Sequence, residues 1–187
     1  MEGGAENDFL FGEEDNDVIR GGTGDDVIEG EGGDDTLFGG PGADYLDGGA
    51  GNDSLDGTNG ALTGGTDGLE FDTLVGGEGD DTLVIGSNDI ATGGAGADVF
   101  VTGTWAEGTD GINDAPYISD FTVGEDTMVI MVPAGYAGAG DVVVENVPGA
   151  TTALVRVLLD GVVVAHIAGQ TAAAIPLSSL SIVEAAA

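Results

Sequence analysis

The chain has 187 residues, and 35 acidic side chains against two arginines give it a formal charge of −33 at pH 7. Such a charge repels nucleic acid and anionic membranes, so we expect neither partner. It also opposes compaction unless cations neutralise the carboxylates. There is no cysteine, which excludes disulfide bonds. No apolar run approaches the ~18 residues of a membrane span, and residues 1–10 lack the basic and apolar regions of a cleaved signal peptide.

Residues 21–56 divide into four blocks of nine, which read GGTGDDVIE, GEGGDDTLF, GGPGADYLD and GGAGNDSLD. Each block has glycine first, aspartate sixth and an aliphatic residue eighth, and the same phase extends from Gly3 to Asp56. A fixed period this short indicates a repeat architecture. With 41% apolar residues in regular places, the chain is expected to fold once cations are bound.

The nonapeptide predicts a tight turn followed by a very short strand. Glycines at the first, second and fourth places permit backbone conformations that residues with a Cβ rarely adopt. In the next three residues, such as Val27, Ile28 and Glu29, the side chains point alternately to the two faces of a strand, and the middle one is expected to be buried. Two turns and two strands then make one coil of 18 residues, and coils stack ~4.8 Å apart. We therefore predict an all-β fold, a right-handed parallel β-roll with a β-rich cap at its C-terminal end.

The phase breaks at residues 57–66, where Leu62 occupies the place of an aspartate. The ladder resumes at Asp72 and includes one step of eight residues between Asp81 and Asp89. Counting Leu62 as a defective rung gives ten aspartate rungs in two columns. The expected columns are Asp8, Asp26, Asp44, Asp81 and Asp98 on one edge, and Asp17, Asp35, Asp53, Asp72 and Asp89 on the other. Metal order is then expected to be weakest at Leu62.

Carboxylates stacked at this spacing repel one another strongly. A hard divalent cation between successive turns removes the repulsion and also accepts the carbonyl oxygens of the turns. Calcium takes six to eight oxygen ligands in flexible geometry, whereas magnesium requires a small octahedron. The ligand type therefore predicts calcium.

The blocks resemble the nonapeptide GGxGxDxUx of the RTX (repeats-in-toxin) family, in which U is a large apolar residue, over residues 3–101. The resemblance implies that each ion takes second- and fourth-place carbonyls and the aspartate of one turn. The next turn on that edge adds its first- and third-place carbonyls and its aspartate. Three sites follow: Gly22, Gly24 and Asp26 with Gly39, Pro41 and Asp44; Glu31, Gly33 and Asp35 with Gly48, Ala50 and Asp53; and Gly77, Gly79 and Asp81 with Gly93, Ala95 and Asp98. Further ligands are expected at Asp8, Asp17, Gly30, Gly32, Asp72 and Asp89. We expect about five to seven calcium ions in all.

The repeat ends near Thr102. The stretch ISDFTVGEDTMVI is similar to the segment after the last repeat in many RTX proteins, including serralysin-type proteases. Strands are expected at residues 142–144, 153–159, 162–168 and 180–183, with a hairpin at Asp160-Gly161 and a helical turn at 171–174. We expect residues 3–101 to form the roll and 102–187 to cap it, because an open coil exposes strand edges.

No catalytic motif is present, and the sole histidine, His166, lies in an apolar strand. We therefore expect a monomeric calcium-binding module and not an enzyme.

The last residues, 184–187, resemble the C-terminus that type I secretion machinery recognises, although a plain tail could have the same sequence. Such a chain would leave a Gram-negative bacterium unfolded and fold outside on calcium. The alternative is a carbohydrate-binding or adhesive module, since the array also resembles the repeat modules of mannuronan epimerases. The scarcity of basic residues disfavours binding to an anionic polysaccharide.

Overall fold

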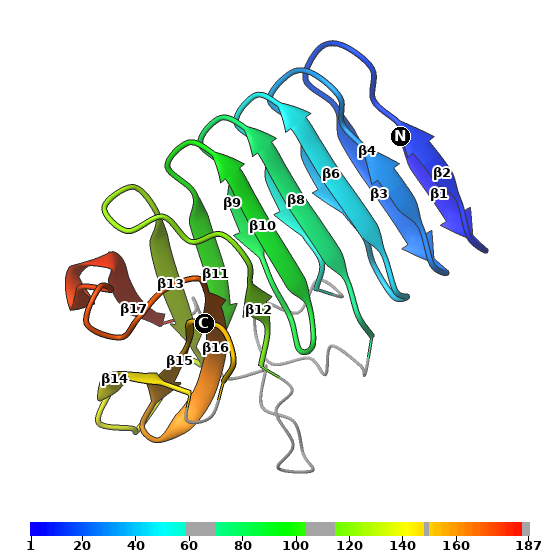
Figure 1. Cartoon of the computed structure of the whole chain (residues 1–187). Coiled ribbons are helices and arrows are strands. Elements are labelled where there is room, and N and C mark those ends of the chain that lie inside the picture. The colour runs from blue at the N-terminus through cyan, green and yellow to red at the C-terminus, as the bar shows by residue number, and fades with distance from the viewer. Residues whose placement is uncertain (59–69, 104–114, 148–149, 185–187) are drawn as a thin grey trace.

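The computed structural model describes residues 1–58, 70–103, 115–147 and 150–184, which form two β-sheets (Figure 1). One sheet has eight strands, in the order β1 (Glu2–Ala5), β3 (Val18–Thr23), β5 (Thr36–Phe38), β7 (Ser54–Asp56), β9 (Thr82–Val84), β11 (Val99–Gly103), β13 (Thr127–Val132) and β17 (Leu180–Glu184). The other has nine, in the order β14 (Val142–Asn146), β15 (Leu154–Leu159), β16 (Val162–Ala168), β12 (Tyr117–Ile118), β10 (Ile90–Ala95), β8 (Thr73–Glu78), β6 (Tyr45–Ala50), β4 (Val27–Glu29) and β2 (Phe9–Phe11).

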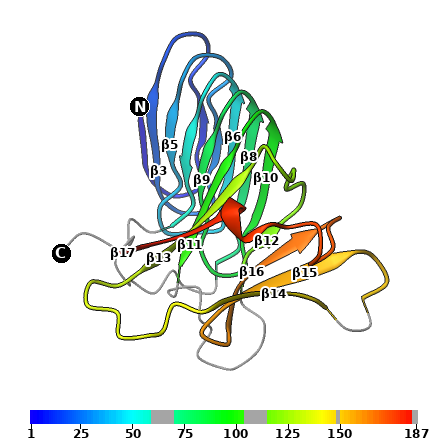
Figure 2. The ribbon, with the colours of Figure 1, turned by 90° about the vertical axis from the view of Figure 1, so that its left-hand side faces the viewer.

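Successive strands of the repeat region alternate between the two sheets, so the chain winds as a flattened coil (Figure 2). Within each sheet the repeat strands pair in parallel, and Val27 faces Phe9 on one side and Tyr45 on the other. These partners are 18 residues apart, as the nonapeptide predicts for a coil of two turns and two strands. The predicted all-β parallel roll is confirmed.

The pairing register changes between the strands on either side of the irregular segment after β7. Tyr45 pairs with Thr73 and Ser54 pairs with Thr82, so the register jumps by 28 residues in both sheets. Leu62 lies outside the described residues, and no rung stands between β6 and β8 or between β7 and β9. The expectation of a defective rung within the ladder is therefore wrong, because the described strands on either side of the gap pair directly with one another.

The core is a stack of the eighth-place side chains between the sheets. Ile19, Ile28, Leu37, Leu46 and Leu55 are fully buried, as the alternation predicts for the middle residue of each short strand. At the first coil Leu10 is 8% exposed because no described strand lies beyond β2. Toward the other end the stack widens with larger side chains, and the rings of Phe100 and Phe121 lie 6.0 Å apart.

The parallel ladder continues past the last nonapeptide through β13 and β17 in one sheet and β12 in the other. β12 also pairs in parallel with β16, which joins the antiparallel strands β14, β15 and β16 to the roll (Figures 1 and 2). The expected hairpin is confirmed, with positive φ at Asp160 and Gly161. A short 3-10 helix, η2 (Leu177–Ser179), precedes β17. In the described part of the chain, no helix has the length and apolar character to cross a membrane.

Candidate metal centre

The sixth-place aspartates form two hydrogen-bonded ladders, one along each edge of the roll. In each ladder the backbone N–H of one aspartate donates to Oδ1 of the aspartate on the next turn, at 2.7–3.0 Å. One ladder runs through Asp8, Asp26, Asp44, Asp72 and Asp89. The other runs through Asp17, Asp35, Asp53, Asp81, Asp98 and Asp126.

The expected columns are correct before the irregular segment and wrong after it. Asp72 follows Asp44 and Asp81 follows Asp53, which is the reverse of the predicted assignment. The prediction counted Leu62 as a rung and so placed every later aspartate on the opposite edge. Because β8 pairs with β6 and β9 pairs with β7, the described strands keep the original alternation across the gap.

Asp126 extends the second ladder and was missed by the repeat pattern. Its neighbours lack the glycines of the nonapeptide, but Asp126-Thr127-Met128 repeats the spacing of Asp98-Val99-Phe100. Val99 pairs with Thr127, so the two triplets lie side by side. A search for an aspartate two residues before a buried apolar side chain finds this rung.

The second carboxylate oxygen distinguishes most rungs from those at the C-terminal ends of the two ladders. The buried Oδ2 atoms of the following aspartates accept no hydrogen bond: Asp8, Asp26, Asp35, Asp44, Asp53 and Asp81. The two arginines are engaged elsewhere, Arg156 with Glu145 at 2.6 Å and Arg20 over the ring of Phe38. A buried carboxylate without a counter-charge is strongly unfavourable. Since neither arginine neutralises the ladder carboxylates, a cation bound at their Oδ2 atoms fits this arrangement.

These oxygens converge with backbone carbonyls beside the first glycine of each turn. A Cβ built on Gly21 would lie 2.3 Å from Asp26 Oδ2 and 2.8 Å from the carbonyl oxygen of Gly39. At Gly30 the corresponding distances are 2.2 Å to Asp35 Oδ2 and 2.6 Å to the Gly48 oxygen. The same arrangement occurs at Gly3, Gly12, Gly48 and Gly76. In each of these turns a carboxylate oxygen and a carbonyl oxygen thus lie close to the same point.

The donor set fits calcium better than a transition metal. Within the described ranges no group of three or more histidine, cysteine or acidic side chains is close enough to hold a metal ion. A cation at the turns must therefore take carbonyl oxygens as well as carboxylates. Calcium accepts such a mixed, irregular set of six to eight oxygens, whereas magnesium does not.

The structure brings together the turns of all three predicted sites. Besides the aspartate pairs, the turns are joined by backbone hydrogen bonds from Gly22 to Gly39 and from Gly24 to Pro41, at 3.1 and 2.9 Å. On the other edge, Gly33 donates to Ala50, and Gly32 forms bridges with Glu14 and Ala50. In the third site Gly79 donates to Ala95, and the Gly93 carbonyl oxygen lies beside Gly76. The remaining predicted residues, Glu31, Gly30, Gly77 and Gly93, lie in these same stacked turns.

The N-terminal turns keep this geometry although they lack several glycines. Glu6, Glu13, Asp15 and Glu31 occupy the second or fourth place of their blocks and have φ between 70° and 84°. This left-handed conformation is unfavourable for residues with a Cβ. Stacking on the regular turns holds these residues in it, so the ladders reach Asp8 and Asp17.

Two rungs at the C-terminal side differ chemically from the others. Asp89 Oδ2 accepts a hydrogen bond from the Gly86 N–H, and Asp126 Oδ2 accepts one from the Thr122 N–H, both at 2.6 Å. These N–H groups partly satisfy the carboxylates that a cation would otherwise have to stabilise. We expect metal binding to be weakest at these two rungs.

A second kind of ladder, formed by exposed fifth-place side chains along both edges, was not anticipated from the repeat. The fifth-place side chains Asn7, Asn16, Asp25, Asp34, Asn52 and Asp80 each accept a hydrogen bond through Oδ1 from the fifth-place N–H of the following turn, at 2.8–3.0 Å. Asparagine and aspartate serve equally because only the acceptor oxygen is used. The recurrence of asparagine and aspartate at the fifth place of the repeat was the sequence signal that could have predicted these hydrogen bonds.

Burial perturbs the titration of the ladder carboxyls. Desolvation, reinforced by the neighbouring aspartates, raises the pKa of Asp44 and that of Asp81 from the ordinary 3.8 to about 6. Burial likewise raises the pKa of Asp53, Asp98 and Asp126. Protons and cations therefore compete for the same oxygens.

We expect acid to stabilise the metal-free fold. Because folding raises the pKa of Asp44 and Asp81, their contribution is fully present below 3.8 and is lost as the pH rises through about 6. In a chelator, circular dichroism should show more β-structure at pH 5 than at pH 8. The double variant Asp44→Asn, Asp81→Asn should flatten this dependence. Equal β-structure at both pH values in the unmodified chain contradicts the assignment.

Comparison with known proteins gives the same result as the geometry. The family model of the RTX calcium-binding nonapeptide repeat matches residues 2–37, 29–61, 66–84 and 86–104, together more than half of the chain. The chain belongs to the RTX calcium-binding repeat family. A search of curated proteins found no match. The solved structures include a similar one, the solution structure of the AlgE6R3 subunit of the Azotobacter vinelandii mannuronan C5-epimerase. It is 23% identical, covers 89% of this chain and 78% of its own, and has a TM-score of 0.33.

Membership of the RTX family makes this chain a calcium-binding β-roll module. The repeat of this family is a structural, calcium-binding unit, and the two aspartate ladders are where the present chain concentrates its oxygen donors.

Proposed function

We propose that this RTX module couples calcium binding to folding outside the cell and so serves as the folding and stability unit of an exported protein. The observation that supports this most directly is the set of buried Oδ2 atoms that converge with carbonyl oxygens at the turns. Without cations, these carboxylates repel along both edges and resist burial. Binding energy at the ladders is therefore folding energy.

In this proposal each ion lies between successive turns of one edge. Asp26, Gly22 and Gly24 of one turn act with Asp44, Gly39 and Pro41 of the next, and the corresponding residues hold ions along both ladders. The converging oxygens beside the first glycines support about five to seven such ions. The terminal rungs at Asp89 and Asp126 contribute least.

The proposal includes a monomer that is exported from a Gram-negative bacterium by the type I route, a route that suits calcium-dependent folding. An unfolded, strongly acidic chain is suited to passage through a narrow channel, and calcium-rich surroundings then order it. In this proposal residues 3–101 form the roll and residues 102–187 cap its end.

Circular dichroism of the whole chain tests the coupling. In a chelator at pH 8 we expect a largely disordered spectrum, because the carboxylates are ionised and unneutralised. Addition of millimolar calcium should produce β-structure in a cooperative transition, and magnesium at the same concentration should not. A spectrum that is rich in β-structure in the chelator, or unchanged by calcium, overturns the proposal.

A further inference from the structure

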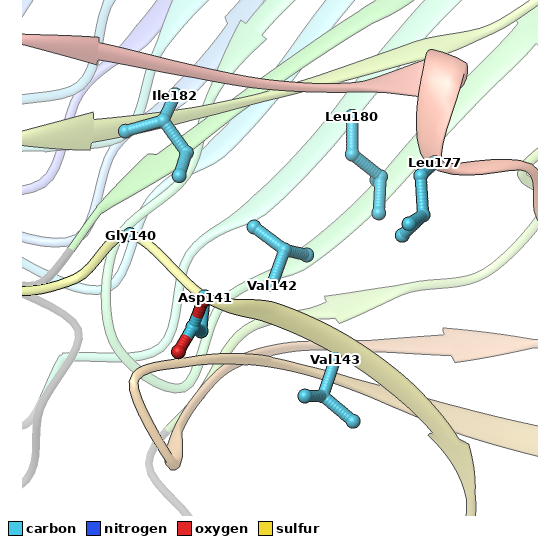
Figure 3. A pocket seen from close by; sticks show the side chains of 7 residues that line it. All are labelled: Gly140, Asp141, Val142, Val143, Leu177, Leu180 and Ile182. Carbon is cyan, nitrogen blue, oxygen red and sulfur yellow. The ribbon is translucent and has the colours of Figure 1, made fainter.

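A largely apolar pocket opens between the last strands of the two sheets, beyond the repeat (Figure 3). Its volume is about 570 Å³. It is lined by Val142 and Val143 of β14, Leu180 and Ile182 of β17, Leu177 of η2, and Gly140 and Asp141. Val142, Leu177 and Leu180 point toward one another across the opening, and Ile182 points toward Gly140 (Figure 3).

The pocket is the uncovered end of the hydrophobic core. Leu180 and Ile182 pair with Met128 and Ile130, which are fully buried, so all four lie on the core-facing side of the eight-stranded sheet. Yet Ile182 is 38% exposed and Leu177 is 62% exposed. The core-facing surface therefore extends past the last described strand, where no side chain of the described residues covers it.

Two strand edges flank this opening. β17 is the last strand of its sheet and β14 is the last strand of the other, and each has one hydrogen-bonded neighbour among the described strands. Alternate backbone N–H and C=O groups along such an edge are available to a further strand. An apolar surface beside a free edge is the combination that extended peptides use when they add to a sheet.

Charge distinguishes between possible occupants. A second copy of this chain would bring 35 further acidic side chains and two arginines, an excess that about five to seven calcium ions do not neutralise, and it would be repelled. The charged residue that lines the pocket is Asp141, and Glu184 ends β17, where its carboxylate accepts a hydrogen bond from the Gly135 N–H. The opening therefore favours an apolar segment that carries a positive charge at its end.

We propose that this opening binds one extended strand of another protein, which pairs with the free edge of β17. Alternate apolar side chains of that strand fill the space between Leu180 and Val142, and a lysine or arginine at its end faces Asp141 or Glu184. The interaction goes beyond calcium-dependent folding, because none of its contacts involves the aspartate ladders.

Synthetic peptides test this inference on the whole, calcium-loaded chain. The probe is a seven-residue peptide in which valines alternate with threonines and lysine stands at both ends. Its matched control has glutamate at both ends, and a third peptide carries N-methyl groups on alternate residues to block strand pairing. Calorimetric titration should show at least tenfold tighter binding of the lysine peptide than of either control.

Substitutions locate the binding. Ile182→Asp and Leu177→Asp should each weaken binding of the lysine peptide at least tenfold. Ile90→Asp, on the outward face of β10 and 47% exposed, should leave the binding unchanged. Circular dichroism with calcium, which should be normal for all three variants, separates loss of the surface from loss of the fold. No binding, equal binding of the three peptides, or full binding by the Ile182 variant overturns the proposal, whatever the result of the calcium titration.

Discussion

Replacing Gly79 by alanine is expected to destabilise the calcium-loaded fold by about 3 kcal/mol or more. Gly79 has a φ of 126°, and an added Cβ would lie 1.9 Å from the carbonyl oxygen of Gly51 on the preceding turn of the same edge. The Cβ is fixed to one stacked backbone and the oxygen belongs to the other, so the clash can be relieved only by separating the turns. That separation would also disturb the ladder pair Asp53 and Asp81, so calcium affinity should fall with stability.

Gly124→Ala is the matched control for this substitution. Gly124 also has a positive φ, 97°, but apart from its chain neighbours no atom of the described residues lies within 4 Å of the position of an added Cβ. Its cost should be limited to local backbone strain, about 1 kcal/mol. Urea denaturation in saturating calcium measures both values. Equal destabilisation by the two variants would show that backbone strain, and not the close stacking of turns, controls stability.

The second large effect is expected at Asp44, where one substitution should weaken calcium-dependent folding and yet stabilise the metal-free chain. Asp44 joins two successive rungs, since its Oδ1 accepts the Asp26 N–H and its own N–H donates to Asp72. Asparagine keeps the acceptor oxygen for Asp26 but removes the charge. With calcium, Asp44→Asn should raise the concentration needed for folding on the order of tenfold or more, because site affinity depends on ligand charge. In a chelator at pH 8 the same change should stabilise the chain, because it removes a buried, unneutralised carboxylate.

Glu29→Gln removes the same charge from the half-exposed, outward-facing side of β4 and is the control. It should shift neither the calcium midpoint nor the metal-free stability appreciably. Calcium titrations followed by circular dichroism, with the chelator baseline recorded for each variant, provide both measurements. A uniform effect of Asp44→Asn and Glu29→Gln would mean that overall charge, and not the ladder, governs the response.

The repeat made most of the fold predictable. Glycine, aspartate and a buried aliphatic residue kept in phase determine turn, ladder and core, so the parallel coil, the pairing of Asp26 with Asp44 and the stack from Ile19 to Leu55 all followed from spacing. Hairpin chemistry at Asp160-Gly161 was equally local and was predicted correctly. These features depend on residues that are close in sequence or separated by one fixed period.

The errors arose where the period changed. Sequence alone does not show whether an irregular segment occupies a place in the coil or lies outside it, and the choice reverses the edge of every later aspartate. Asp126 was missed because its turn is made by Thr122–Glu125 and not by glycine-rich residues, although its carboxylate continues the ladder. The fifth-place ladder was missed because its members vary between asparagine and aspartate while sharing one acceptor oxygen.

The number of calcium ions bound per folded chain tests most directly whether calcium lies between the turns of both ladders. Equilibrium dialysis at pH 8 in millimolar calcium, with β-structure recorded on the same samples, gives the count and its relation to folding. We predict about five to seven ions per chain, taken up together with the gain of β-structure. A chain that folds with no ion or a single ion bound, or that binds several ions without gaining β-structure, would contradict this arrangement.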